Sequence, residues 1–234
     1  MALYLRQLLA GRDFALADGI ASQMANFVYL IGDEDERVCM VVDPAWDIPG
    51  ILKVLDKEGM RLVGALVTHY HPDHIGGTVF GHSISGLGEL LSLRPVKIYV
   101  NAFEREGVKI VSGISDTDIA EQKGGDEISI GNTKLKFLHT PGHTPGSQCF
   151  LADGVLVSGD TLFIGGCGRV DLPGGNSDEL YRSLTQVLGR LPGETLLYPG
   201  HNYSTRPIST IADEKRENYY MKIPNLESWR QLMG

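Results

Sequence analysis

The sequence predicts an α/β layered domain, in which β-sheet is packed against helices on its outer faces. Short β-rich runs come first, and helix-like stretches are interspersed among later runs along the 234 residues. The polar motifs all follow strand-like runs, and loops at strand ends are where a rigid sheet presents functional side chains. The composition is that of a globular protein, because 42% of the residues are hydrophobic and 21% are charged.

The first half of the chain predicts strands and one helix. Its short apolar runs rich in β-branched residues predict strands over 27–32, 37–43, 62–67 and 96–101. The segment 47–59 predicts a helix, because Pro49 stands near its start and Gly59 lies past its end. The range 78–123 is mixed in character, and we expect it to form an insertion over the functional site.

The second half predicts two hairpins followed by helices and a strand. The segment 126–140 predicts a hairpin closed at Gly131-Asn132, and 148–160 predicts one that turns at Asp153-Gly154. Further elements are expected as a helix over 177–191 that begins at Ser177 or Asp178, a strand over 195–200, and helices near 208–220 and 225–233. No linker interrupts the chain, so we expect a single domain over 1–234 with the insertion at about 78–123.

Charge and composition exclude several functions. The net charge of −8 argues against a nucleic-acid partner, which would need a basic face. No apolar run approaches the roughly 18 residues that span a bilayer, and the N-terminal segment does not resemble a secretory signal. The three cysteines are widely spaced and odd in number, which favours a reducing, cytoplasmic setting. The oligomeric state stays open, a homo-oligomer included.

The stretch LVTHYHPDHIGG (66–77) predicts a metal site. His69 and His71 are two residues apart in an extended segment, so their side chains point the same way. Asp73 and His74 follow Pro72, where the chain turns towards a helix. Their side chains can therefore face a second position beside the one that His69 and His71 face. Neutral imidazoles and carboxylates suit zinc, iron and manganese.

Three later motifs offer further ligands after strand-like runs. His143 lies in PGHTPGS, Asp160 in SGDTLF and His201 in YPGHNY. Glycine or proline stands beside each candidate, which fixes the loop shape and lets the backbone approach closely. An aspartate at the end of a strand can also simply form a turn, so Asp160 is a candidate ligand mainly because other candidate ligands accompany it.

The motifs T-H-x-H-x-D-H, G-H-T-P-G-S, G-D-T and the final G-H resemble the metallo-β-lactamase-fold superfamily over about residues 24–220. The resemblance implies an αββα four-layer sandwich with a dinuclear metal site at one edge of its two sheets. It implies two divalent metal ions, zinc first, with iron and manganese as alternatives. Their ligands would be His69, His71 and His143 for the first ion and Asp73, His74 and His201 for the second, with Asp160 as the bridge.

The loop GDTLFIGGCGR is similar to the glyoxalase II and persulfide dioxygenase branch, whose members act on glutathione conjugates. Glyoxalase II carries lysine and tyrosine where this chain has Arg169 and Asp171, whereas persulfide dioxygenases share the arginine, the aspartate and a tyrosine matching Tyr203. We expect Arg169 and Tyr203 to bind substrate. The alternative for Arg169 is a surface salt bridge to Asp171.

The leading interpretation is a metal-dependent hydrolase that uses a metal-bound hydroxide on a small acyl substrate, most simply a thioester and possibly a glutathione conjugate. Asp73 is expected to be catalytic as well as a ligand. The alternative is an iron-dependent glutathione persulfide dioxygenase. Two other histidines stand apart: His139 is expected to be structural, and His82 is a weak candidate to face the substrate. Cys167 is expected to pack in its loop.

Overall fold

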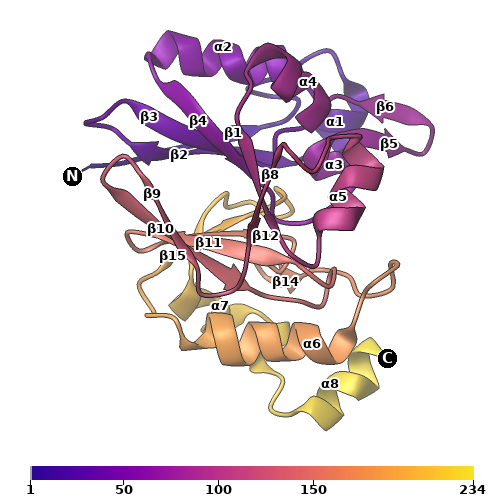
Figure 1. Ribbon diagram of the computed structural model, residues 1–234. Helices are drawn as coiled ribbons and strands as arrows, with labels where there is room; N and C mark the ends of the chain where they lie inside the picture. Colours follow the sequence, from indigo (N-terminus) through magenta and orange to yellow (C-terminus); the bar gives the residue numbers. More distant parts are fainter. Residues whose placement is uncertain (1) are drawn as a thin grey trace.

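Two β-sheets lie face to face between two outer layers of helices in the computed structural model, which describes residues 2–234 (Figure 1). The first half of the chain forms the upper helical layer and the upper sheet, and the second half forms the lower pair of layers. This arrangement is the four-layer αββα sandwich that the motifs implied, so the predicted fold class is confirmed.

The first sheet has the order β1-β2-β3-β4-β7-β8. Its strands are β1 (Leu3–Leu9), β2 (Phe27–Asp33), β3 (Val38–Val42), β4 (Arg61–Leu66), β7 (Lys97–Asn101) and β8 (Ile119–Gln122). The pairs β1–β2 and β2–β3 are antiparallel, whereas the pairs β3–β4, β4–β7 and β7–β8 are parallel. The helices of this half are α1 (Gly19–Met24), α2 (Ile48–Glu58), α4 (Leu87–Leu93) and α5 (Arg105–Ser112).

The second sheet has the order β16-β15-β12-β11-β10-β9. Its strands are β9 (Glu127–Ile130), β10 (Thr133–His139), β11 (Gln148–Ala152), β12 (Val155–Gly159), β15 (Leu196–Pro199) and β16 (Ser209–Thr210). Helices α6 (Ser177–Arg182), α7 (Ile211–Glu217) and α8 (Leu226–Met233) cover its outer face (Figure 1). Helix α6 continues through a π-helical turn and a 3-10 turn to Arg190, so one helical stretch fills the range predicted as a single helix.

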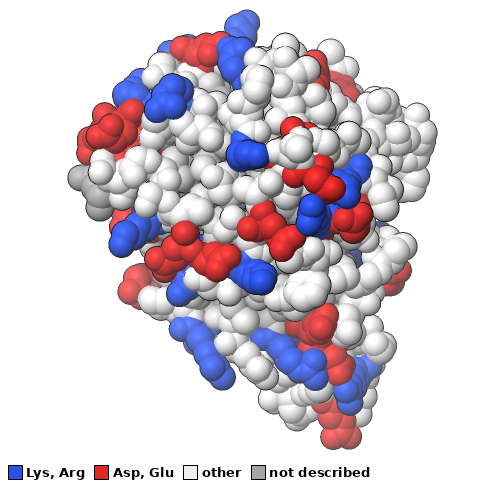
Figure 2. All heavy atoms as spheres, viewed as in Figure 1, with Lys and Arg blue, Asp and Glu red and all other residues white. Residues whose placement is uncertain are grey.

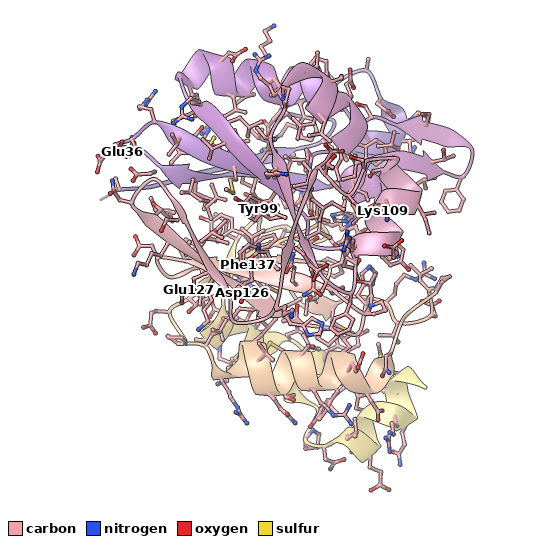
Figure 3. All side chains as sticks on the ribbon, viewed as in Figure 1. Glu36, Tyr99, Lys109, Asp126, Glu127 and Phe137 are labelled. Carbon is pink, nitrogen blue, oxygen red and sulfur yellow. The ribbon has the colours of Figure 1, made fainter. Side chains whose placement is uncertain are left out.

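The core between the two sheets follows from strand alternation. Along β10, the buried side chains of Thr133, Leu135 and Phe137 alternate with exposed lysines. Phe137 points towards Tyr99 of the opposite sheet (Figure 3), and the two rings stack with their centroids 6.4 Å apart. A second apolar cluster lies under α2 and α4, and a third lies between the second sheet and α6 to α8.

Some expected boundaries differ from the structure. The helix was expected to have Ser177 or Asp178 as its N-cap, but the N-cap is Asn176, whose side chain accepts a hydrogen bond from the amide of Glu179. The range 78–123, expected as an insertion, contributes β7, α5 and β8 to the first sheet and its cover. Its first part forms a separate hairpin of β5 (Gly77–Val79) and β6 (His82–Ile84), which projects from the molecule (Figure 1).

The surface carries mixed charge. Figure 2 shows acidic and basic side chains interspersed over one face of the molecule, without a continuous basic patch on that face. Between residues 2 and 234, no helix is both long enough and apolar enough to cross a membrane.

Candidate metal centre

The loop after β4 places four of the predicted ligands. The strand ends at Leu66, His71 is still extended, and the short helix α3 (Pro72–Ile75) begins directly after it. Proline is favoured at the first helical position because its missing N–H has no partner there. The extended segment therefore carries His69 and His71, while the helical turn swings Asp73 and His74 to a neighbouring point.

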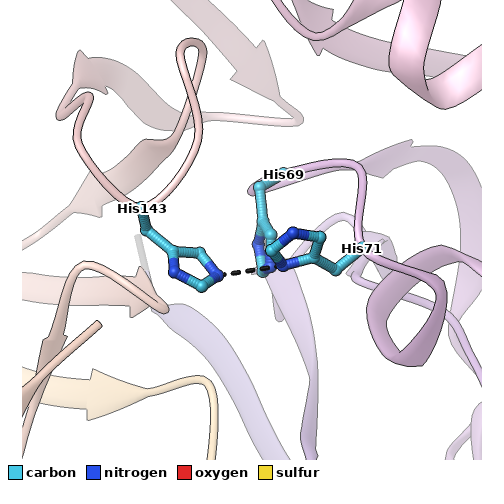
Figure 4. A group of neighbouring side chains, drawn as sticks. All are labelled: His69, His71 and His143. Carbon is cyan, nitrogen blue, oxygen red and sulfur yellow. Dashed lines mark hydrogen bonds between the residues drawn. The ribbon is translucent and has the colours of Figure 1, made fainter. Parts of the chain in front are cut away.

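The first group consists of three histidines. One ring nitrogen each from His69, His71 and His143 lie within 4.8 Å of one another. His143 comes from the loop between β10 and β11 and faces the two histidines of the β4 loop (Figure 4), with its Nε2 atom 3.0 Å from Nδ1 of His71. His69 is buried, and its Nε2 atom has no hydrogen-bond partner among residues 2–234.

The second group consists of Asp73, His74 and His201. Nε2 of His74 lies 3.2 Å from Nε2 of His201 and 3.3 Å from Oδ2 of Asp73. The remaining separation, from Nε2 of His201 to Oδ2 of Asp73, is 3.4 Å. Ligands about 2.0–2.1 Å from a tetrahedral ion are themselves about 3.3–3.4 Å apart, so this spacing fits a divalent metal.

Asp160 lies between the two groups. Its Oδ1 atom is 3.4 Å from Nε2 of His74, and its Oδ2 atom is 3.3 Å from Nε2 of His201 and 3.7 Å from Nε2 of His143. Glycines at 159 and 200 allow this approach, because a Cβ atom on Gly200 would lie 2.4 Å from Oδ1 of Asp160. That oxygen is buried and accepts no hydrogen bond from any residue that the structure describes.

Metal ions fit this donor set. Three buried side-chain atoms are left without hydrogen-bond partners in residues 2–234: Oε1 of Gln148 and, among the candidate ligands, Nε2 of His69 and Oδ1 of Asp160. Such atoms are costly in a folded protein unless something satisfies them. Imidazole nitrogens with carboxylate oxygens are a donor set for zinc, iron or manganese, and the orphaned atoms of His69 and Asp160 lie where those donors converge.

Four histidines are held in the tautomer that a metal ligand needs. The Nδ1 atoms of His74, His143 and His201 donate to Asp43, to the Arg169 carbonyl and to the Met24 carbonyl, at 2.9, 2.8 and 2.8 Å. Nδ1 of His69 lies 2.9 Å from the Thr68 hydroxyl, which itself donates to Asp43, so His69 is the donor. Each ring therefore keeps the lone pair of Nε2 for the site.

The site's own electrostatics favour metal binding. Burial, reinforced by the neighbouring imidazoles, lowers the pKa of His69 well below its ordinary value and that of His71 to about 4. Burial raises the pKa of Asp160, but His201 and His74 outweigh it and hold that pKa well below the usual range. Neutral imidazoles beside an ionised carboxylate are the protonation states that ligate a cation. At the second group burial lowers the pKa of His74 and of His201, but the carboxylates of Asp73 and Asp160 outweigh it and raise both, so a cation that binds there displaces protons from these rings.

The family follows from this geometry and from one comparison. The sequence model of the metallo-β-lactamase superfamily matches residues 22–201, a range that contains all seven predicted ligands. The chain belongs to the metallo-β-lactamase superfamily.

Relatives in this superfamily include enzymes of two kinds. The chain is 33% identical to human mitochondrial persulfide dioxygenase ETHE1 over 213 residues, covering 89% of this chain and 76% of that protein. It is 38% identical to hydroxyacylglutathione hydrolase from Alkalilimnicola ehrlichii over 179 residues, covering 76% and 62%. The crystal structure of ETHE1 from Myxococcus xanthus superposes with a TM-score of 0.80 at 32% identity, covering 98% of this chain and 89% of that one.

Supporting residues of this metallo-β-lactamase domain escaped the sequence analysis. Asp43, at the end of β3, accepts hydrogen bonds from the amide and hydroxyl of Thr68 and from His74. Asn26 donates from Nδ2 to Oδ2 of Asp73 at 3.0 Å and accepts from Nε1 of Trp46 at 3.1 Å. A signal existed for Asp43, since it also closes a predicted strand.

A buried glutamate joins the two ligand loops. Glu104 lies at the start of α5 and accepts hydrogen bonds from the amide of Tyr70, the amide of Gly146 and the hydroxyl of Thr144. Tyr70 stands between two predicted ligands, and Thr144 directly follows His143. Burial raises the pKa of Glu104, while these donors oppose the shift.

A cavity of about 740 Å³ opens onto the ligands. Tyr203 is 60% exposed and stacks on His201 with ring centroids 4.7 Å apart. Arg169 also lines the cavity, but both arms of its guanidinium donate to Asp171 at 2.7 Å, which is the surface pair considered for it above. Cys167 lines the wall as well, and burial raises its pKa to about 12.

The remaining histidines lie away from the ligands. His139 stacks on Phe103 and bonds the carbonyl of Pro145 through Nε2 at 2.9 Å. His82 pairs with Asp18 at 2.9 Å and lines a different cavity, of about 840 Å³, beside Trp46. These contacts agree with the structural role expected for His139 and place His82 outside the cavity that holds the ligands.

Proposed function

We propose that this protein is a dinuclear metal-dependent hydrolase whose substrate is a small thioester. The observation that carries the proposal is a pair of ligand groups joined by one carboxylate, Asp160, which lies 3.3–3.7 Å from histidines of both groups. In this assignment His69, His71 and His143 hold the first ion, and Asp73, His74 and His201 hold the second. Zinc is the first choice of metal, with iron and manganese as alternatives.

The reaction breaks the acyl carbon–sulfur bond and forms a carbon–oxygen bond to water, and the thiolate that leaves takes up a proton. Two divalent ions held by these residues would supply a water of lowered pKa and would polarise the carbonyl oxygen of the thioester. Asp73 is 9% exposed and lines the cavity, so we assign it the transfer of the water's proton as well as its ligand role. The rings of Phe163 and Tyr203 meet edge to face at 5.3 Å and shield the second group from water.

Substrate binding is assigned to the rim of the cavity. Tyr203 presents its exposed edge there, and Arg169 presents a guanidinium that a substrate carboxylate can reach only in competition with Asp171. Glutathione conjugates carry such carboxylates, and both kinds of relative described above are named for glutathione or persulfide chemistry. A cytoplasmic setting is part of the proposal, supported by three cysteines that are all free.

Metal content and thioester hydrolysis test the proposal together. About two divalent ions per chain and hydrolysis of a thioester panel are expected for the protein purified without added metal. Asp160→Ala should lose both ions, because it removes the carboxylate that the two groups share. Full metal content in Asp160→Ala, or no hydrolysis of any panel member by the loaded protein, would contradict the assignment.

Iron-dependent oxidation of glutathione persulfide is the second candidate. The likeness to ETHE1 from Myxococcus xanthus over 98% of this chain favours it, as does the loop from Cys167 to Asp171. This activity would consume one oxygen molecule and one water and would release glutathione, sulfite and two protons. One iron per chain with oxygen uptake on adding glutathione persulfide would support it, and absence of uptake by the iron-loaded protein would rule it out.

A further inference from the structure

The tip of the β5–β6 hairpin carries an aromatic side chain in an unfavourable position. Phe80 is 100% exposed, and its backbone is left-handed with φ of 49°, followed by Gly81 with φ of 80°. Two successive left-handed residues make the tight hairpin turn in which asparagine, aspartate and glycine are preferred. A phenylalanine there costs folding free energy in its backbone, and its fully exposed ring gains no burial that would offset this cost.

This hairpin belongs to the wall of the metal cavity. Val79 and Phe80 line the same cavity as His71, Asp73 and His143. The hairpin follows α3 directly, so the tip lies only a few residues from the ligands that α3 carries. A group bound at the metal positions would therefore lie in a cavity whose border includes Phe80.

Most of the other side chains in the wall are apolar. Side chains that share the cavity with Phe80 are Met24, Phe163, Ile164, Leu172, Tyr203 and Tyr220. Of the described residues that line it, Arg169 alone has a fixed positive charge, and Asp171 already neutralises that charge. Figure 2 also shows surface without charged side chains where the β5–β6 hairpin projects, which agrees with the uncharged sequence of residues 77–84.

We propose that Phe80 and Val79 form the binding site for an apolar acyl group, so that the substrates are thioesters of medium-chain or aromatic acids. The inference rests on the proposed hydrolase function and names its substrate class. Covering the Phe80 ring with an acyl chain removes apolar surface of both from water, which favours binding. A cavity of about 740 Å³ has room for such a chain beside the metal positions.

Binding of product acids tests the inference without relying on turnover. Calorimetric titration of the zinc-loaded protein with acetate, butyrate, hexanoate and octanoate should give affinities that rise with chain length, by up to about fourfold per methylene. In Phe80→Ala, octanoate should bind about tenfold more weakly while acetate is unchanged. Ile110→Ala is the matched control, because Ile110 is 82% exposed on α5 and does not line the cavity.

A second variant separates function from folding. Phe80→Asn suits the left-handed turn, so it should raise the melting temperature while losing octanoate affinity as Phe80→Ala does. A structural role for Phe80 would instead lower the melting temperature. Affinities that do not depend on chain length, or a Phe80→Ala variant that binds octanoate as wild type does, would overturn the inference.

Turnover distinguishes the inference from the function on which it rests. kcat/KM for the matching series of acyl thioesters should increase with chain length and fall in Phe80→Ala for the long members only. Chain-length-dependent binding without hydrolysis of any thioester would overturn the hydrolase and leave the apolar site standing. Equal kcat/KM values along the series would support the hydrolase and contradict the apolar acyl site. The acyl site would also be contradicted if the wild-type protein were a dimer that Phe80→Ala dissociates, because Phe80 would then contact a second copy of the chain.

Discussion

Single residues outside the ligand set decide how the second metal position is built. The indole nitrogen of Trp46 can only donate, so the atom of Asn26 that meets it must be the amide oxygen. The amide nitrogen is thereby turned towards Asp73, at 3.0 Å from Oδ2. The same nitrogen also lies 3.4 Å from Nε2 of His74 and 3.5 Å from Nε2 of His201, so Asn26 contacts every member of the second group.

Asn26→Ala should weaken the second metal position selectively. Loss of a hydrogen bond to a ligand typically costs about 10–100-fold in metal affinity, and here the loss falls on Asp73. Elemental analysis after dialysis should give about one ion per chain instead of two. Trp46→Phe should have a smaller effect in the same direction, and Asn132→Ala, in an exposed turn, should keep both ions.

The pairing of Arg169 with Asp171 makes a prediction about charged substrates. Asp171→Asn removes the carboxylate that occupies both arms of the guanidinium. KM for a glutathione thioester should fall several-fold, whereas KM for an N-acetylcysteamine thioester with the same acyl group should not change. An equal change in KM for both substrates would show that Arg169 does not meet the glutathione carboxylates.

At the scale of elements, the two loops that carry the three-histidine group are joined through α5. Glu104, at the start of α5, accepts hydrogen bonds from both loops, so the spacing of His71 and His143 depends on one buried carboxylate. The joint is tight, since a Cβ atom on Gly146 would lie 2.6 Å from the side chain of Glu104.

Glu104→Gln should therefore destabilise the protein by about 1–3 kcal/mol, because an amide group cannot accept all three donors. Chemical denaturation of metal-free protein measures this free energy of unfolding. Glu106→Gln, on the exposed side of the same helix, should change it by less than about 0.5 kcal/mol. If the two variants were equally stable, the loops would be held by other contacts.

Across the whole molecule, the metal centre joins the two sheets. The ligands from the β4 loop and α3 belong to the first half of the chain, and His143, Asp160 and His201 belong to the second. An ion that binds only the folded state stabilises it, by about 4 kcal/mol when its free concentration is 1,000 times its dissociation constant. For a chain of this size, chelation should then lower the melting temperature by about 10 °C, and added zinc should restore it.

The sequence predicted the elements and ligands that have local signals. The two hairpin turns, the capping Gly59 and every strand that precedes a ligand were visible as short patterns. Strands β1 and β8 were missed, since their identity depends on pairing with distant strands. Asn26 and Glu104 were missed for a related reason: each is one ordinary polar residue, and its role exists only once residues 20 or more positions away pack against it.

The contact between residues 24–27 and 200–202 has a consequence for biosynthesis. His201 is anchored to the start of β2 through its own ring and the flanking amides. During synthesis the region around residue 160 leaves the ribosome before His201 does. At that stage the nascent chain already contains His69, His71, His143 and Asp160, whereas the second group still lacks His201. The second group is therefore completed only when the late segment docks on the early one.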